Sequence, residues 1–143
     1  MVDAGPRKRR GFRVPSSVLI LAHGSTSTDD LFRECDERHD LWTIRVPSIS
    51  ASAAAMRVVC VSLVIIAPEI SSDTVGDLLA ELGRLENEAP VLLLRSEAAT
   101  IPPAWKSPHM AVLRCPLAPG LLSRAVDLAL RPARTKRDRA RLN

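Results

Sequence analysis

The sequence alternates between short aliphatic runs and longer segments with helical signals, and this alternation limits the fold more than any other feature does. The run from Val61 to Ile66 is interrupted only by Ser62, and it ends at Ala67 before the chain turns polar. A nearly continuous apolar run is typical of a strand that is covered on both faces of a parallel sheet. Five strands are expected, in the segments 16–25, 41–46, 61–66, 89–97 and 111–115. Strands that alternate with helices predict an α/β fold with a parallel sheet between helical layers.

Helical signals lie between the predicted strands. The clearest are in residues 71–88, where Ser72 or Asp73 can cap a helix whose apolar residues recur at helical spacing. Three further helices are expected, in the segments 25–40, 50–59 and 116–130. Prolines restrict residues 98–110 to a turn or a broken segment, and Pro132 favours a break in the final helix.

Charge divides the chain into a body and two basic ends. The net charge is +4, yet residues 14–130 carry nine basic and fourteen acidic side chains. Residues 1–13 carry five basic and one acidic side chain, and residues 131–143 carry six and one. We therefore expect one domain over residues 14–130, preceded by a disordered basic leader and followed by a basic tail. Such ends attract phosphate backbones or anionic membranes, or simply keep a protein soluble.

The cysteines and the start of the chain indicate a reducing, cytoplasmic environment. Cys35, Cys60 and Cys115 are odd in number and share no close spacing, which predicts neither a disulfide framework nor a zinc site. The basic leader has no small-residue cleavage site, so we expect no secretory signal. Every apolar run is far shorter than the roughly 18 residues of a membrane span. No cofactor or bound metal is expected.

Two segments carry a resemblance to a known family. SLVIIAPEISSDTVGDLLAEL, residues 62–82, resembles the third strand, phosphorylation loop and third helix of the receiver domains of bacterial response regulators. VLRCPLAPGLLSRAVDLAL, residues 112–130, is similar to the fifth strand, the lysine-proline pair and the last helix of that family. Pro116 matches the family proline, which commonly follows a cis bond. The resemblance covers residues 17–130 and implies a flavodoxin-like (CheY-like) three-layer α/β/α sandwich, a (βα)5 unit with a five-stranded parallel sheet.

The resemblance also implies which groups receiver chemistry requires. An acidic pair after the first strand and an aspartate after the third bind Mg²⁺, and that aspartate accepts the phosphoryl group. A hydroxyl after the fourth strand senses the phosphate, and a lysine after the fifth pairs with it. The corresponding positions are Ala22 and His23, Ala67, Arg95 or its neighbour Ser96, and Cys115. Glu69 is the only carboxylate close to the end of the third strand. The resemblance thus predicts a degenerate, phosphorylation-independent receiver that is not an enzyme.

A surface for partners is implied by the same resemblance. In the family, dimers and effectors dock on the face formed by the fourth helix, fifth strand and fifth helix. In this sequence that region contains Trp105, Arg114, Pro116 and Arg124. An aromatic anchor with flanking arginine is typical of an interaction hot spot. We expect a protein-protein interaction module, or a homodimer, in bacterial two-component signal transduction; the alternative for Trp105 is that it fills the gap left by a short fourth helix.

Binding of nucleic acid is an alternative from another class. The two ends together carry eleven cations, enough for salt-dependent attraction to phosphates. Phe12 is the only aromatic residue in either end, so no platform for base stacking accompanies the charge. Binding through the ends is therefore expected to be weak and nonspecific.

Two enzymatic alternatives depend on single residues. LAHGS, residues 21–25, resembles the opening of small tetrapyrrole metal chelatases, in which the histidine, here His23, lies at the metal site. Such enzymes need a second histidine with an acidic partner, and no motif surrounds His39 or His109. A serine hydrolase has less support, because Ser25 and Ser96 lie at strand ends without a GxSxG elbow.

Overall fold

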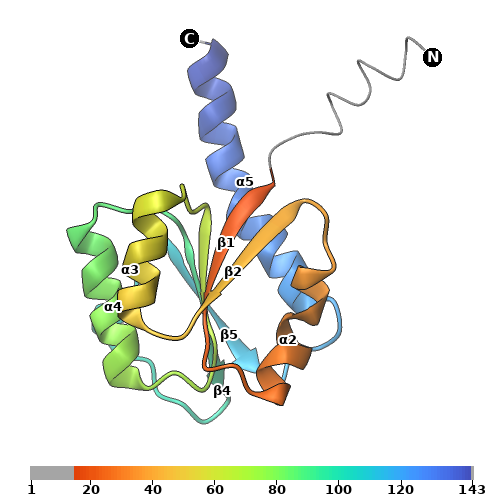
Figure 1. Ribbon diagram of the computed structural model, residues 1–143, viewed down its shortest axis with the longest axis vertical. Helices are drawn as coiled ribbons and strands as arrows, with labels where there is room; N and C mark the ends of the chain where they lie inside the picture. The colour runs from red at the N-terminus through yellow and green to blue at the C-terminus, as the bar shows by residue number, and fades with distance from the viewer. Residues whose placement is uncertain (1–14, 143) are drawn as a thin grey trace.

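A computed structural model describes residues 15–142 of the chain, apart from the side chains of residues 26, 27 and 132–142 (Figure 1). Its elements, in chain order, are β1 (Ser16–Leu21), α2 (Thr26–Asp36), β2 (Leu41–Val46), α3 (Ile49–Val58), β3 (Leu63–Ile66), α4 (Ser72–Arg84), β4 (Val91–Ser96), the 3-10 turn η1 (Pro103–Trp105), β5 (Met110–Cys115) and α5 (Leu121–Leu142). The predicted basic leader, residues 1–13, lies outside the described residues. β3 begins at Leu63, two residues later than predicted.

The five strands form one parallel sheet in the order β2-β1-β3-β4-β5. Helices α2 and α5 pack together on one face, and α3 and α4 pack together on the other (Figure 1). This is the flavodoxin-like order, so the predicted three-layer α/β/α fold is confirmed. In such sheets the carboxyl ends of all strands lie at one edge, and this edge positions the candidate site.

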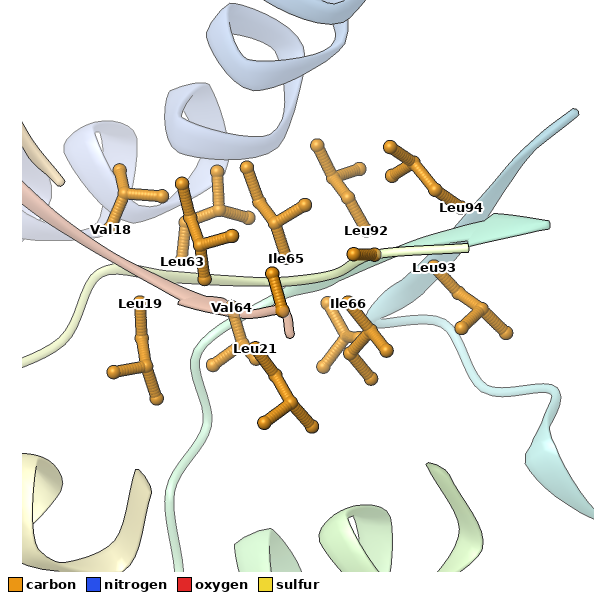
Figure 2. Close-up of a cluster of buried hydrophobic side chains, with 14 of the residues drawn as sticks. Val18, Leu19, Leu21, Leu63, Val64, Ile65, Ile66, Leu92, Leu93 and Leu94 are labelled. Atoms are coloured by element: carbon orange, nitrogen blue, oxygen red, sulfur yellow. The ribbon is translucent and has the colours of Figure 1, made fainter. Parts of the chain in front are cut away.

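The core consists of aliphatic side chains on both faces of β1, β3 and β4. Figure 2 shows alternate residues of these strands pointing to opposite sides of the sheet. Toward α5 lie Val18, Leu63, Ile65, Leu92 and Leu94, and on the other side lie Leu19, Leu21, Val64, Ile66 and Leu93. All ten are buried. Burial on both faces explains why these strands read as continuous apolar runs and not as alternating ones.

Three of the helices begin with a serine cap. Ser25, Ser48 and Ser71 each accept a hydrogen bond from the backbone amide three residues later. These bonds satisfy amides that have no partner inside the helix. The cap of α4 is therefore Ser71, one residue before Ser72 and two before Asp73, the two predicted caps.

The connection from β4 to β5 contains only η1, as the prolines in this segment predict. The prediction of a break at Pro132 is wrong, because α5 continues from Leu121 to Leu142. A proline removes one amide donor and can kink a helix without ending it. The neighbouring alanine, arginine, lysine and leucine residues are good helix formers and favour continuation. In the part of the chain that the structure describes, no helix has the length and apolarity required to cross a membrane.

Candidate functional site

The carboxyl ends of β1, β3, β4 and β5 bring together the positions that the sequence analysis singled out. Ala22 continues β1, since its amide donates to the Val46 carbonyl at 3.0 Å. Ala67 continues β3, since its amide donates to the Leu21 carbonyl at 3.0 Å. Ser96 and Cys115 face each other in register at the ends of β4 and β5. The parallel topology therefore places all the predicted positions along one edge.

The two alanines are buried at the centre of this edge. Ala22 is 5% exposed and Ala67 is fully buried. A methyl group offers no oxygen to a metal ion and no nucleophile to a phosphoryl donor. Among the side chains that the structure describes, no three His, Cys, Asp or Glu residues gather closely enough to hold a metal ion.

Glu69 connects the two loops that follow β1 and β3. One carboxylate oxygen, Oε2, accepts a hydrogen bond from the His23 backbone amide at 2.9 Å. The other, Oε1, accepts from the Thr28 hydroxyl at 2.8 Å. Thr28 in turn lies 2.8 Å from the Ser25 hydroxyl that caps α2. The carboxylate close to the end of β3 therefore joins the β1–α2 and β3–α4 loops.

Arg95 extends from β4 beneath the β3–α4 loop. It is 6% exposed, and its guanidinium donates to the Ile70 carbonyl and, at 3.4 Å, to the Pro68 carbonyl. A third donor lies 3.5 Å from the Ser72 hydroxyl. Burial lowers the pKa of the Arg95 guanidinium. The side chain at this predicted switch position thus supports the loop from below, while the neighbouring Ser96 is exposed.

Trp105 covers the guanidinium of Arg95. The Arg95 carbon Cζ lies 5.8 Å from the centre of the Trp105 ring, within range of a cation–π interaction. The indole also approaches α4, where a Cβ at Gly76 would lie 3.7 Å from Nε1. Trp105 is half-buried and packs against the core. This position is the one expected if Trp105 fills the gap left by a short fourth helix, and its role as a partner anchor stays a prediction.

The end of β5 carries three more of the predicted residues. Cys115 is half-buried, and burial raises the pKa of its thiol, which disfavours a reactive thiolate. The peptide bond between Cys115 and Pro116 is cis, like the bond that commonly precedes the family proline. Arg114 donates to the carbonyls of Ser96 at 2.9 Å and Ala99 at 2.6 Å. It therefore holds the chain that leaves β4.

An exposed strip runs along β5 and α5, and we call it the β5–α5 surface. Arg124, one of the residues named for the expected docking face, lies on it and is exposed. The strip consists of Ala111 on β5 and of Leu121, Arg124 and Leu128 on α5, whereas Arg114 pairs with Arg95 on the opposite face of the sheet. Leu128 is 58% exposed, and sequence reasoning missed it because the helix was described only by its inward stripe. The sequence does contain a signal for this exposure. Leu128 lies two residues from each of the buried positions Val126 and Leu130, and on a helix this spacing turns a side chain away from their face.

A groove of about 1030 Å³ borders this surface near the amino ends of β3, β4 and β5. Its walls include Ala111 and Leu113 of β5 and Ala125, Leu128 and Ala129 of α5. β5 is only partly covered because the single turn of η1 takes the place of a fourth helix. The β5–α5 surface therefore combines apolar area with exposed arginine.

The three histidines do not converge. His23 follows the carboxyl end of β1, whereas His39 and His109 precede the amino ends of β2 and β5. These ends lie at opposite edges of a parallel sheet. The arrangement gives the chelatase-like alternative no second histidine near His23. Ser25 is occupied as a helix cap, which gives the hydrolase alternative no support.

No family model matches the sequence, and no match is found among curated proteins. Solved structures do resemble the chain. The signal receiver domain of a Luxo repressor protein from Vibrio parahaemolyticus has a TM-score of 0.70 at 16% identity, over 86% of this chain and 95% of that one. A response regulator receiver domain from Clostridium thermocellum has a TM-score of 0.63 at 18% identity, over 84% and 98% of the two chains.

A third similar structure is the pseudo-receiver domain of the CikA protein, with a TM-score of 0.59 at 16% identity, over 81% of this chain and 97% of that one. At these identities the likeness concerns the fold. The sheet order, the two helical layers and the cis bond before Pro116 agree with it. The chain therefore has the fold of response regulator receiver domains, a fold that a pseudo-receiver shares.

Proposed function

We propose that this chain is a phosphorylation-independent receiver-like module of signal transduction that binds a protein partner or a second copy of itself. The observation that carries the proposal is the fully buried Ala67 after β3, where receiver chemistry needs an aspartate. Three further residues support the proposal. Ala22 supplies no carboxylate, Cys115 no ammonium group, and Arg95 binds the loop that would have to respond.

The contacts of Glu69 support the same proposal. In a switching receiver, the loops at the carboxyl edge must rearrange when a phosphoryl group arrives. Here the β1–α2 and β3–α4 loops are already joined through the Glu69 carboxylate. A metal ion would have to displace two hydrogen bonds to use that carboxylate, and it would find no acid at Ala22 or Ala67.

The first experiment is incubation of the full chain with Mg²⁺ and acetyl phosphate, followed by intact-mass measurement. We expect no added mass, while an aspartate-containing receiver treated in parallel gains one phosphate. A phosphate on this chain that survives acid and is lost in base would be an acyl phosphate and would contradict the proposal. An acid-labile phosphate that disappears in His23→Ala would identify histidine chemistry and contradict it as well.

The β5–α5 surface supports the binding part of the proposal. Leu121 and Leu128 are exposed at 39% and 58%, and the adjoining groove offers further apolar area. Apolar and arginine side chains beside a half-covered edge strand are suited to a protein interface.

Sedimentation velocity of the full chain tests self-association, and the same variants test any candidate partner. We expect Leu128→Glu to weaken association at least tenfold with little change in melting temperature. Val58→Glu is the matched control, because Val58 is 84% exposed on α3, in the other helical layer. Equal effects of the two substitutions, or none from Leu128→Glu, would contradict a role for this surface.

Trp105→Ala distinguishes the two roles considered for that residue. If Trp105 anchors a partner, the variant loses more affinity than stability. Its half-buried position over Arg95 predicts the opposite order, with the larger effect on unfolding. Comparing urea unfolding with association of the same variant gives the ranking directly.

A further inference from the structure

A basic segment of the chain projects beyond the amino edge of the sheet. β1 begins at this edge with Ser16. α5 runs antiparallel to the strands, and its last turns project beyond the sheet at the same end (Figure 1). The candidate site lies at the opposite edge. We call the projecting segment, residues 132–142, the basic extension.

The first half of α5 is firmly fixed to the body. Glu34 of α2 accepts hydrogen bonds from the backbone amides of Gly120 at 3.2 Å and Ser123 at 2.7 Å. Arg38 donates to the Ser123 hydroxyl at 2.9 Å and to Asp127 at 2.7 Å. A helix held in this way fixes the direction in which its continuation leaves the molecule.

The apolar pattern of α5 ends where the extension begins. Leu122, Val126 and Leu130 are buried and recur at every fourth position. The next two positions of this series are Arg134 and Asp138. The extension therefore lacks the stripe that packs a helix onto its own sheet.

The composition of the extension identifies the chemistry of its ligand. Five cations and one acid occur in its eleven residues, and the cations are Arg134, Lys136, Arg137, Arg139 and Arg141. A surface helix that binds membranes needs a face of large apolar residues. The only apolar residues here other than Pro132 are Ala133, Ala140 and Leu142. The extension also contains no aromatic residue on which a single-stranded base could stack.

We propose that the basic extension binds the phosphate backbone of double-stranded nucleic acid without reading its sequence. A helix of this length spans about 16 Å, and a duplex presents one phosphate charge per about 1.7 Å along its axis. The extension is thus long enough to lie beside about nine phosphates. The acidic balance of residues 14–130 directs the duplex to this end, because like charge repels it from the rest of the molecule.

The test measures binding of the full chain to a fluorescent 24-base-pair DNA duplex of arbitrary sequence, over a series of salt concentrations. If four cations each neutralise one phosphate, the slope of log K against log salt is about −3.6. Two unrelated duplex sequences should bind equally. A slope near zero, or a strong preference for one sequence, would overturn the proposal.

A charge-matched pair of variants locates the contact. The extension variant replaces all five cations by glutamine, as R134Q/K136Q/R137Q/R139Q/R141Q. The body variant removes the same charge from exposed positions, as R33Q/R57Q/R84Q/K106Q/R124Q. We expect the extension variant to lose more than about 100-fold in affinity at low salt and the body variant to lose less than about tenfold. Equal losses would show that net charge alone is responsible and would overturn the proposal.

Two further measurements test other negatively charged ligands of the extension. Vesicles of phosphatidylcholine with phosphatidylserine test a membrane surface, and sedimentation without DNA tests whether the extension of one copy binds the acidic body of another. Binding to vesicles but not to duplex would overturn the proposal. Self-association that disappears in the extension variant, without any DNA binding, would overturn it as well.

Discussion

The two helical layers are attached to the same sheet by different means. On one face, α2 and α5 are joined by polar contacts that remain partly open to solvent, including those of Glu34 and Arg38. On the other, α3, α4 and η1 pack mainly through apolar side chains, and Arg95 lies buried beneath Trp105. In both layers side chains cross between elements far apart in the sequence. The two layers differ in the solvent exposure of those side chains. This exposure determines how much each contact contributes to the free energy of unfolding.

Exposure matters because water competes with charged contacts. A surface ion pair contributes about 0–1 kcal/mol, since solvent already stabilises both partners. A buried polar group that loses its partner costs more, about 1–3 kcal/mol, since no water replaces the contact. Substitutions of exposed ion-pair residues in the α2–α5 layer should therefore each lower the free energy of unfolding by a small, salt-dependent amount. Substitution of a buried polar residue in the α3–α4 layer should lower it by a larger amount.

Arg95→Ala is the substitution with the largest expected effect. It leaves the carbonyls of Pro68 and Ile70 without their donor and opens a space beneath Trp105. We expect the free energy of unfolding to fall by about 3 kcal/mol in urea titrations. Arg95→Lys keeps the charge but not the planar fork, and it should lose about half as much. A loss below 0.5 kcal/mol for Arg95→Ala would remove the contrast between the layers.

High pH should weaken the α2–α5 layer through Cys35. Burial, followed by the charge of Glu34, raises the pKa of this thiol from 9.0 to about 11. Between these values the folded thiol keeps its proton while the unfolded thiol loses it, so stability decreases as pH rises. We expect a loss of about 2 kcal/mol between pH 8 and 11 under reducing conditions.

Cys35→Ala is the control for this titration, because it removes the group and should flatten most of the pH dependence. Burial also raises the pKa of Cys115, which adds a smaller change of the same sign. An unchanged pH dependence in Cys35→Ala would contradict the assignment.

Glu34→Ala tests the contact between the first and last helices. The variant removes the acceptor for two backbone amides at the start of α5. A lost helix cap of this kind costs about 1 kcal/mol. Glu37→Ala, an exposed position three residues later, should change the unfolding free energy by less than about 0.3 kcal/mol. Similar effects of the two variants would show that general charge, and not capping, is responsible.

The smallest effect is expected from Arg45 at the outer edge of the same layer. Its guanidinium binds Asp29 and Asp36 and lies 5.7 Å from the centre of the Phe32 ring. Arg45→Gln should cost about 0.5 kcal/mol in dilute buffer, and the difference should shrink in 1 M salt because exposed pairs are screened. A cost that persists at high salt would indicate packing of the arginine stem and not charge.

The sequence predicted the fold well because burial on both faces leaves a strong local signal. The apolar runs around Leu19, Ile65 and Leu93 can hardly be anything but covered strands, and the prolines beside Trp105 correctly exclude a full helix there. The prediction of a break at Pro132 was wrong because it relied on one residue, whereas helix formation depends on the whole surrounding segment.

The site was predicted only as positions along the chain. Parallel topology was sufficient to bring Ala22 and Ala67 to one edge, and the structure places them there. The bonds of Glu69 to His23 and Thr28 join residues 46 and 41 positions apart, respectively, and no local pattern signals them. The burial of Arg95 depends on how the β3–α4 loop folds over it. Such contacts follow from tertiary packing, which composition and spacing do not encode.

The capping of α5 by Glu34 has a consequence for the order in which the protein is made. The other helices after β1 begin with their own serine, so each can be capped as soon as it is synthesised. Glu34 leaves the ribosome 86 residues before Gly120 and 89 before Ser123. The Glu34 carboxylate on α2 therefore finds these partners only after the chain has been translated as far as α5, and α5 is the element that completes the domain.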